Sequence, residues 1–255
     1  MNGLDTNTFV KHFAETGGKG TPKYVQLREA LLRTIEGGHW RPGDQLPSEQ
    51  DLAESLPVSL GTVQKTLRWL ADEGIVVRKH GQGTFVAGTY QKQMEGIWHF
   101  RFVDDDGKTL LPVFSRVTGR GLVKRNGPWT EFLGPDSSGY LRVTRLLNIN
   151  EEFEVYSEFY LAAARFSPLL EMPLDELHGV NFKHVLSKHF NAPTFHVLQH
   201  IRCVSMPIKV CDAIGVARDT YGLRIEVFGR TYRDAPLSYQ VIYVPPNGRR
   251  LEMPG

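Results

Sequence analysis

Cysteine and long apolar runs are both scarce in this sequence of 255 residues. Its only cysteines are Cys203 and Cys211, which are too few for the disulfide framework of a small secreted scaffold. It has no run of roughly 18 apolar residues, and residues 1–20 lack the apolar core of a signal peptide. We therefore expect no membrane partner and a reducing, cytoplasmic location.

A large excess of charge of either sign is also absent. The formal net charge is +2 at pH 7, with 41% hydrophobic and 23% charged residues, the composition of an ordinary globular protein. This balance argues against tight, non-specific binding to polyanions over the whole surface. The length is sufficient for two domains.

The common catalytic signatures are missing as well. The sequence has no Gly-x-Ser-x-Gly elbow, no phosphate loop of the P-loop type and no His-Glu-x-x-His motif. His196 and His200 are four residues apart on a predicted strand, so their Cα atoms lie about 13 Å apart, too far to share a metal. We predict hydrogen-bonded or surface histidines, no catalytic residue, no metal, no cofactor and a protein that is not an enzyme.

Two short helices joined by a tight turn are predicted in the first third of the chain. Ser48 is a helix cap with Asp51 as the return partner of a capping box, and a helix follows over 49–56. After Pro57, Ser59 caps a second helix that begins at Leu60. This is the layout of a helix-turn-helix.

A hairpin is predicted directly after the second helix. Gly74 ends that helix, and residues 75–78 and 84–86 have the pattern of two short strands on either side of the glycine-bearing turn 80–83. Two helices followed by a two-stranded wing form a winged helix.

One side of this winged helix offers hydrogen-bond donors to nucleic acid. At 100° per residue, Val63, Leu67 and Leu70 form a buried stripe on the second helix, and the opposite face is polar. Charge alone would also fit an ordinary solvated face, but the helix-turn-helix spacing with a basic wing favours DNA binding. The predicted DNA contacts are Ser48, Gln50, Ser59, Gly61, Thr62, Gln64, Lys65, Arg68, Arg78, Lys79, His80, Gly81 and Gln82.

The winged helix resembles the N-terminal domain of bacterial GntR-family transcription regulators over residues 22–88. The resemblance rests on Leu-Pro-Ser-Glu at 46–49 and Gly-x-Gly-Thr-Phe-Val at 81–86, which lie at the family's spacing from each other. It implies that the helix from Leu60 enters the major groove of a DNA operator. It also implies that the tip at His80 reaches the adjacent minor groove.

The sequence departs from the family pattern at the positions that read bases. Family members commonly carry arginines where this chain has Gln50, Leu60 and Gln64. Gln64 can read an adenine edge, Thr62 can bond a phosphate or a base, and Gly61 allows a close approach to the backbone. We therefore predict an operator that differs from the family's commonest half-site.

The rest of the chain divides into a leader, a linker and a second domain. We predict a disordered leader over 1–21, the winged helix over 22–88, a linker over 89–95 and the second domain over 96–255. The second domain has mostly alternating patterns and few helical ones, which predicts a mostly antiparallel α+β fold. The predicted strands are 98–103, 112–118, 140–149, 153–161, 195–204, 223–232 and 237–244, and the predicted helices are 129–132, 163–170, 181–190 and one from 206 to near 215.

The second domain resembles the UTRA effector-binding domain of the HutC subgroup of GntR regulators, which has the chorismate lyase fold. The residues that carry this resemblance are 143–146, 156–161, 230–232 and 239–246. It implies that a small-molecule effector binds here and that the domain forms a homodimer.

An anionic effector is expected because several arginines lie among apolar strand residues and need a partner. For Arg142 and Arg224 we favour internal carboxylates as partners. The resemblance implies that Arg145 contacts the effector. Leu147 stands where sugar-phosphate-binding relatives carry a second arginine. The predicted effector contacts are Arg145, Tyr156, Ser157, Glu158, Tyr160, Asn181, Arg230 and Tyr239.

These features together predict a DNA-binding transcription regulator, by default a repressor, controlled by a small anionic metabolite. Two alternatives stay open from the sequence. One is an enzyme of the chorismate lyase type tethered to DNA, and the other is a constitutive DNA-binding dimer without an effector.

Overall fold

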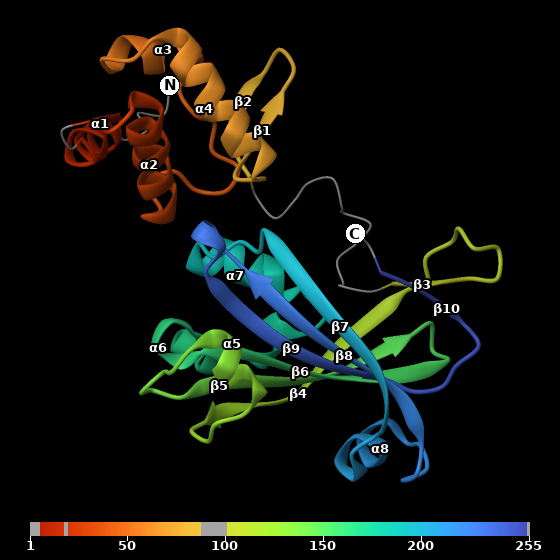
Figure 1. Cartoon of the computed structure of the whole chain (residues 1–255). Helices are drawn as coiled ribbons and strands as arrows, with labels where there is room; N and C mark the ends of the chain where they lie inside the picture. Colours follow the sequence, from red (N-terminus) through yellow and green to blue (C-terminus); the bar gives the residue numbers. More distant parts are fainter. Residues whose placement is uncertain (1–5, 18–19, 88–100, 254–255) are drawn as a thin grey trace. The chain divides into compact units, whose positions relative to one another are not determined.

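The computed structural model describes residues 6–17, 20–87 and 101–253 (Figure 1). The chain forms two compact units that divide between residues 92 and 93, with residues 186–195 grouped with the first unit. We describe each unit by itself. The predicted linker, 89–95, and the start of the strand predicted at 98 lie outside the described residues.

The first unit is a winged helix with one additional helix at its N-terminal end. Leu27, Leu31 and Ile35 recur at intervals of four on α2 and are fully buried. They pack with the buried stripe of α4, as the spacing predicts. The elements are α1 (Thr6–Glu15), α2 (Lys23–Glu36), α3 (Glu49–Ser55), α4 (Leu60–Asp72), β1 (Val76–Lys79) and β2 (Gly83–Val86).

The additional helix, α1, corrects the prediction of a disordered leader for residues 6–15. Phe9 and Phe13 lie on one face of α1 and are buried, and the Phe9 ring lies 5.1 Å from that of Trp40. The helix packs along α2. The leader appears polar in sequence, but two aromatic residues four apart are enough to dock one helical face on an existing core.

Both predicted helix caps are present. The Ser48 hydroxyl accepts from the amide of Asp51, whose carboxylate accepts from the amide of Ser48 in return, so the capping box is complete. The Ser59 hydroxyl accepts from the amide of Thr62 at the start of α4. The wing pairs antiparallel, with Val76 opposite Val86.

The second unit is built on a six-stranded antiparallel sheet of strand order β4-β5-β6-β9-β8-β7. All predicted strands are present, but β4 continues past Thr118 because a bulge between Val117 and Gly119 lets the strand resume. The strands are β4 (Val113–Val123), β5 (Tyr140–Ile149), β6 (Phe153–Ala162), β7 (His196–Ser205), β8 (Tyr221–Arg230) and β9 (Pro236–Val244).

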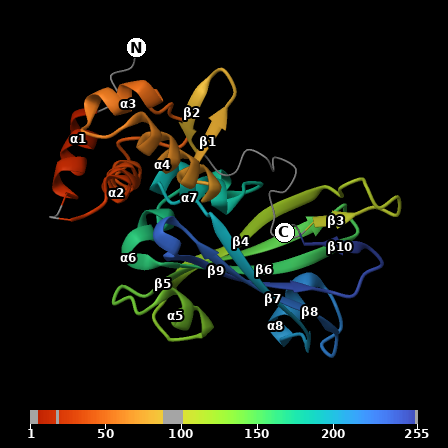
Figure 2. The ribbon, with the colours of Figure 1, turned by 45° about the horizontal axis from the view of Figure 1, so that its top comes forward.

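Helices cover both faces of this sheet. Phe182 of α7 packs on Phe159, and we call this side the α7 face. Helices α5 and α8 pack on the other side, where Trp129 of α5 stacks on Tyr160, and we call it the α8 face. Figures 1 and 2 show α7 and α8 on opposite sides of the sheet. The helices are α5 (Pro128–Leu133), α6 (Ala163–Phe166), α7 (Phe182–Phe190) and α8 (Ile208–Ile214), with 3₁₀ turns at Ser167–Leu170, Leu174–Leu177 and Tyr232–Asp234.

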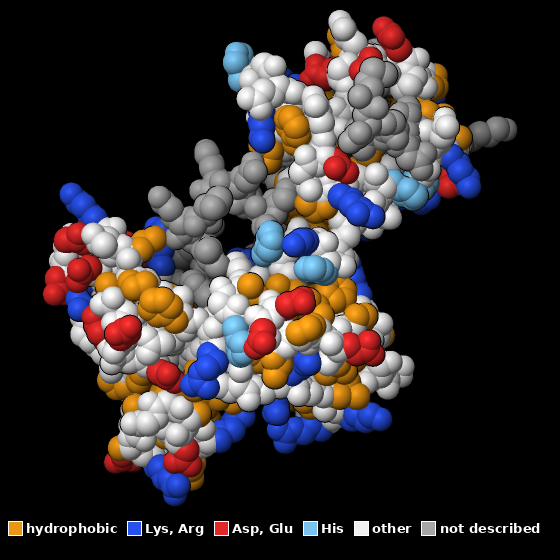
Figure 3. All heavy atoms as spheres, turned by 180° about the vertical axis from the view of Figure 1, so that it is seen from behind, with side chains coloured by type: hydrophobic (Ala, Val, Ile, Leu, Met, Phe, Trp, Pro, Cys, Tyr) orange, Lys and Arg blue, Asp and Glu red, His pale blue; other side chains and the backbone are white. Residues whose placement is uncertain are grey.

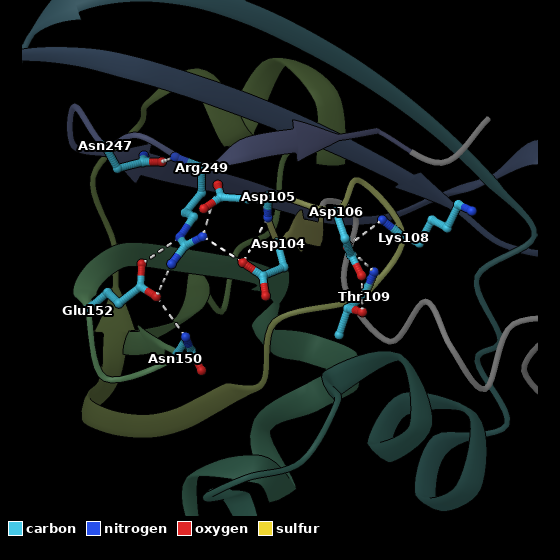
Figure 4. Close-up of polar contacts among 9 residues, drawn as sticks. All are labelled: Asp104, Asp105, Asp106, Lys108, Thr109, Asn150, Glu152, Asn247 and Arg249. Atoms are coloured by element: carbon cyan, nitrogen blue, oxygen red, sulfur yellow. Dashed lines mark hydrogen bonds and ion pairs between the residues drawn. The ribbon is translucent and has the colours of Figure 1, made fainter.

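A small sheet joins the first and last described strands of this unit, β3 (Arg101–Val103) and β10 (Arg250–Glu252). The Arg249 guanidinium binds both carboxylate oxygens of Glu152 and also Asp104 and Asp105 (Figure 4). This pairing raises the pKa of Arg249 and lowers that of Glu152. Arg249 therefore fastens three separate segments of the chain together.

The surface carries no large region of one charge on the side seen in Figure 3, where Asp and Glu are interspersed with Lys and Arg on the second unit. This agrees with the small net charge of the whole chain. None of the helices in the described ranges is long and apolar enough to span a bilayer.

Candidate DNA-binding surface and effector site

The polar face of α4 lies open to solvent. Val63, Leu67 and Leu70 are fully buried beneath it, which fixes the rotation of the helix and turns the opposite side chains outward. None of the thirteen predicted DNA contacts is buried. Thr62 and Lys79 are half-buried, and the exposed ones are Ser48, Gln50, Ser59, Gly61, Gln64, Lys65, Arg68, Arg78, His80, Gly81 and Gln82.

A single carboxylate ties the polar face of α4 to the wing. Glu49 accepts a hydrogen bond of 2.9 Å from Gln64 Nε2 through one oxygen, and its other oxygen pairs with Arg78. The sequence did not predict this contact, because Gln64 lies 15 positions and Arg78 lies 29 positions after Glu49. Two of the predicted DNA contacts therefore share one intramolecular partner.

The wing is tied to the segment that precedes α3. Gln45 Nε2 donates to the carbonyl of Gln82 at 2.7 Å, and Gly83, at φ +114°, leaves room for the Gln45 side chain. A Cβ at Gly83 would lie 2.7 Å from Gln45 Nε2. Between the wing and α3 is a groove of about 550 Å³ lined by Ser48, Glu49, Arg78, Lys79 and His80 among others.

The lysines of this surface lie over aromatic rings. Lys65 Nζ is 5.4 Å from the ring centre of Tyr24 on α2, and Lys79 Nζ is 4.7 Å from that of Phe85 on the wing. Such contacts restrain the long side chains and place no negative charge beside the ammonium groups. Both charges remain available to bind phosphates.

The predicted effector contacts do not form one cluster, because they lie on both faces of the sheet. Arg145 and Ser157 are directly opposite each other in β5 and β6 and lie on the α7 face. The residues next to Ser157, Tyr156 and Glu158, point to the α8 face, since successive strand residues alternate. Tyr160 and Tyr239 lie on the α8 face with them.

On the α7 face, Arg145 is buried to 2% exposure among aromatic rings. Its guanidinium carbon lies 4.8 Å from the ring centre of Phe182 and 5.8 Å from that of Phe159. Burial lowers the pKa of Arg145 to about 10. Ser157 beside it accepts a hydrogen bond of 2.7 Å from Gln240, a buried residue that no sequence pattern singles out.

The start of α7 adds a second cation to this face of the domain. Asn181 caps the helix, because its Oδ1 accepts from the amide of Lys183 at 2.9 Å. Burial lowers the pKa of the Lys183 ammonium to about 8. Arg145 and Lys183 are thus both cations whose charged form is disfavoured by lost hydration.

On the α8 face, Glu158 is a buried carboxylate with three donors. Tyr156 and Tyr160 each donate to it at 2.9 Å, and Lys209 of α8 donates at 2.6 Å. Burial acts to raise the pKa of Glu158, but Lys209 and the two hydroxyls outweigh it and the net pKa is lowered. Burial and the nearby carboxylate raise the pKa of both tyrosines.

A second carboxylate lies in the same row of the sheet, two strands away. Glu226 pairs with Arg224 at 2.5 Å and with Arg202 at 3.2 Å, and it accepts from the hydroxyl of Tyr239. Arg142 approaches Glu158 to 4.0 Å. The prediction of internal partners for Arg142 and Arg224 is therefore confirmed.

Arg230 lies at the end of β8 and has internal partners as well. Its Nη1 donates to the carbonyl of Asp234 at 2.7 Å, and its guanidinium lies 5.1 Å from the ring centre of Phe132. Arg230 and Asn181 therefore have structural roles within the described residues, in addition to any contact with an effector.

The histidines have separate surroundings. His178 Nδ1 accepts from the amide of Val117, and the His200 ring lies beside Phe228. Over the residues that the structure describes, no three His, Cys, Asp or Glu side chains converge as a metal site would require.

Fold and surface define a class: a winged helix with an open polar recognition helix, followed by an antiparallel domain that buries cations. The model of bacterial regulatory proteins of the gntR family matches residues 23–86, and the UTRA domain model matches residues 114–248. The chain therefore belongs to the UTRA-domain family, with a GntR winged helix as its DNA-binding domain.

The relatives are named as regulators. The chain is 44% identical over 66 residues to the histidine utilization repressor of Klebsiella aerogenes, covering 26% of this chain and 27% of that protein. It is 38% identical over 131 residues to the transcriptional repressor NagR of Bacillus subtilis, covering 50% and 53%. The matched segments thus span from about a quarter to about half of these relatives. Both of these relatives are named as repressors.

The fold of the second unit has a solved counterpart. A ligand-binding domain assigned to a GntR-family regulator of Bordetella bronchiseptica matches with a TM-score of 0.53 and 15% identity, over 60% of this chain and 94% of that chain. At this identity the likeness shows the fold alone.

Proposed function

We propose that this protein is a transcriptional repressor whose affinity for a DNA operator is controlled by a small anionic metabolite bound on the α7 face. The observation that carries the proposal is that one unit has an open, polar recognition helix while the other contains a buried cation, Arg145. The names of the relatives support repression as the direction of control.

For DNA, α4 would lie in the major groove and the wing beside the adjacent minor groove. Lys65, Arg68 and Lys79 offer charge to phosphates, and Gln64 offers an amide to a base edge. Gln50, Leu60 and Gln64 replace arginines that are common in the family, so the operator should differ from the family's commonest half-site.

For the effector, the proposed site comprises Arg145, Ser157 and the start of α7 at Asn181 and Lys183. An anion would favour the charged forms of the buried Arg145 and the half-buried Lys183, which the loss of hydration disfavours. Leu147 lies on the same face as Arg145 and offers no second guanidinium. This favours an effector with a single compact anionic group over a sugar phosphate.

A second copy of the chain is part of the proposal, because one helix and one wing contact too little DNA for strong specificity. The edge strand β7 supports this idea. It pairs only with β8 among the described strands and exposes Val197, Leu198 and Ile201, and an antiparallel edge can pair with itself about a two-fold axis.

A thermal-shift screen of the full chain against sugar phosphates, imidazole acids and carboxylates tests the proposal, since a ligand that binds only the folded form raises the melting temperature. A compound that raises it and also weakens operator binding would support an effector-controlled repressor. Operator binding with no responsive compound would favour the constitutive dimer, and turnover of a compound would favour the tethered enzyme.

Light scattering on the same sample reports the number of copies. Ile201→Lys should shift the protein from two copies to one, because a charge in the centre of the β7 edge opposes pairing. A dimer that persists in this variant would place the interface elsewhere.

A further inference from the structure

We propose that Glu49 is a positioning residue for base recognition, which orients the Gln64 amide so that it reads adenine. The inference rests on the proposed DNA-binding function and adds a residue that contacts no base itself. It is carried by the hydrogen bond from Gln64 Nε2 to Glu49 and by the pairing of the same carboxylate with Arg78.

The contact joins the three elements that form the predicted DNA surface. Glu49 is the first residue of α3, Gln64 lies on the outer face of α4, and Arg78 lies in β1. Glu49 is itself held in place by the capping box of its helix, which fixes the backbone on either side. Its side chain is 24% exposed, so the carboxylate is partly shielded from water.

The chemistry of the two groups sets the orientation of the amide. A carboxylate has no proton to donate, so only the NH₂ end of Gln64 can face it, and a reversed amide would bring two oxygens together. The amide oxygen and the second N–H of Gln64 then remain available. Adenine presents an acceptor, N7, beside a donor, the N6 amino group, in the major groove, and the fixed amide matches this pair.

Glu49 also carries a cost for affinity. Its negative charge lies on a surface that would face phosphates, and it holds Arg78, which could otherwise bind one. Removing the charge should therefore strengthen binding to random DNA while weakening discrimination between bases. A residue that served only to stabilise the fold would weaken both together.

The experiment begins with selection of the preferred operator from random duplex DNA by the full-length chain. Dissociation constants are then measured for that operator, for its single A·T to G·C variants and for a random duplex. The proteins compared are wild type, Gln64→Ala, Glu49→Gln, Glu49→Asp and the double variant Glu49→Gln/Gln64→Ala. Glu54→Gln is the matched control, because it removes an exposed charge from the same helix.

Gln64→Ala should reduce discrimination at one A·T position by roughly 5- to 150-fold, the range for a bidentate contact. Glu49→Gln and Glu49→Asp should reduce it at the same position by about 3- to 10-fold, and the double variant should match Gln64→Ala, because the two residues act as one unit. Glu49→Gln should also bind random DNA more tightly. Glu54→Gln should keep the wild-type discrimination.

The inference is overturned if both Glu49 variants, or Gln64→Ala, discriminate between the operator and its A·T to G·C variants as strongly as wild type does. The DNA-binding function would remain intact in that case. If wild type selects no sequence, the DNA-binding function itself is wrong, and the inference is wrong with it. Far-UV circular dichroism reports folding of each variant, and Glu49→Asp retains the charge at the helix start if Glu49→Gln does not fold.

Discussion

The winged helix and the sheet domain hold their charged side chains in opposite ways. On α4 the charges of Lys65 and Arg68 lie in water above an apolar core, whereas Arg145 and Glu158 lie inside the layers of the sheet domain. Hydration stabilises a charge in water, and such a charge can attract a large polyanion. A buried charge is costly unless it is paired, so it discriminates sharply between partners. The first arrangement suits a long duplex and the second suits a small ligand.

The largest effect that would test this contrast is expected at Arg145. Arg145→Met keeps much of the volume between Phe159 and Phe182 but removes the buried cation, so it should reduce effector affinity by on the order of 100-fold or more. Operator binding without effector should be unchanged. Titration of the effector by calorimetry and of the operator by gel shift measures both quantities, and an unchanged effector affinity would remove Arg145 from the site.

A matched pair of lysine substitutions sharpens the contrast in stability. Lys209→Met leaves Glu158 buried with one donor fewer and should lower the free energy of unfolding by about 2 kcal/mol at neutral pH. Lys65→Met removes a charge over open surface and should change it by less than about 0.5 kcal/mol. Urea unfolding measures the free energy of unfolding of both variants. Equal losses would contradict the contrast between exposed and buried charges.

The loss in Lys209→Met should also depend on pH. The folded pKa of Glu158 is lowered in the wild type, so the stabilisation from its donors is present above its unfolded pKa and is lost as pH falls through the folded pKa. The difference between wild type and variant should therefore shrink in acid, where Glu158 is protonated in both proteins. A difference that is constant from neutral to acidic pH would assign the cost to packing instead.

On the winged helix, Lys65→Ala and Arg68→Ala should each weaken operator binding by roughly 3- to 10-fold and lower the slope of log affinity against log salt by about 1. Binding to all sequences should weaken alike, because phosphate contacts carry no base information. Equilibrium titrations at several salt concentrations provide the slopes. Unchanged slopes in both variants would show that the recognition face is wrongly assigned.

The smallest expected effect concerns Lys183. Its folded pKa is lowered to about 8, so the ammonium is charged below that pH and loses its charge as pH rises through it. If it binds the effector, affinity should fall several-fold between pH 7 and 9, and Lys183→Met should abolish that dependence. An identical pH profile in the variant would separate Lys183 from the effector.

Local signals predicted most of the fold, because the residues that define each element are close in sequence. The Ser48 and Asp51 capping box, the αL glycine Gly215 that ends α8 and the alternation along β5 all act over a few residues. Helix α1 was missed because its order depends on a distant residue, Trp40.

The site was harder to predict for the same reason. Tyr156, Ser157 and Glu158 were all predicted to contact the effector, yet neighbours in a strand lie on opposite faces of the sheet. Lys209 and Glu226 were not selected, because only the strand register and α8 bring them to the tyrosines. The role of Glu49 depends on contacts across the chain that no sequence pattern records.

The fastening of β3 by β10 and Arg249 has a practical meaning for handling the protein. β3 is the first described strand of the second unit, and its only described strand partner is the last one, β10. Trimming the chain after Asn247 would remove Arg249 and β10 together and leave β3 without its partner. A chain shortened at this point is therefore a poor substitute for the intact one in binding assays.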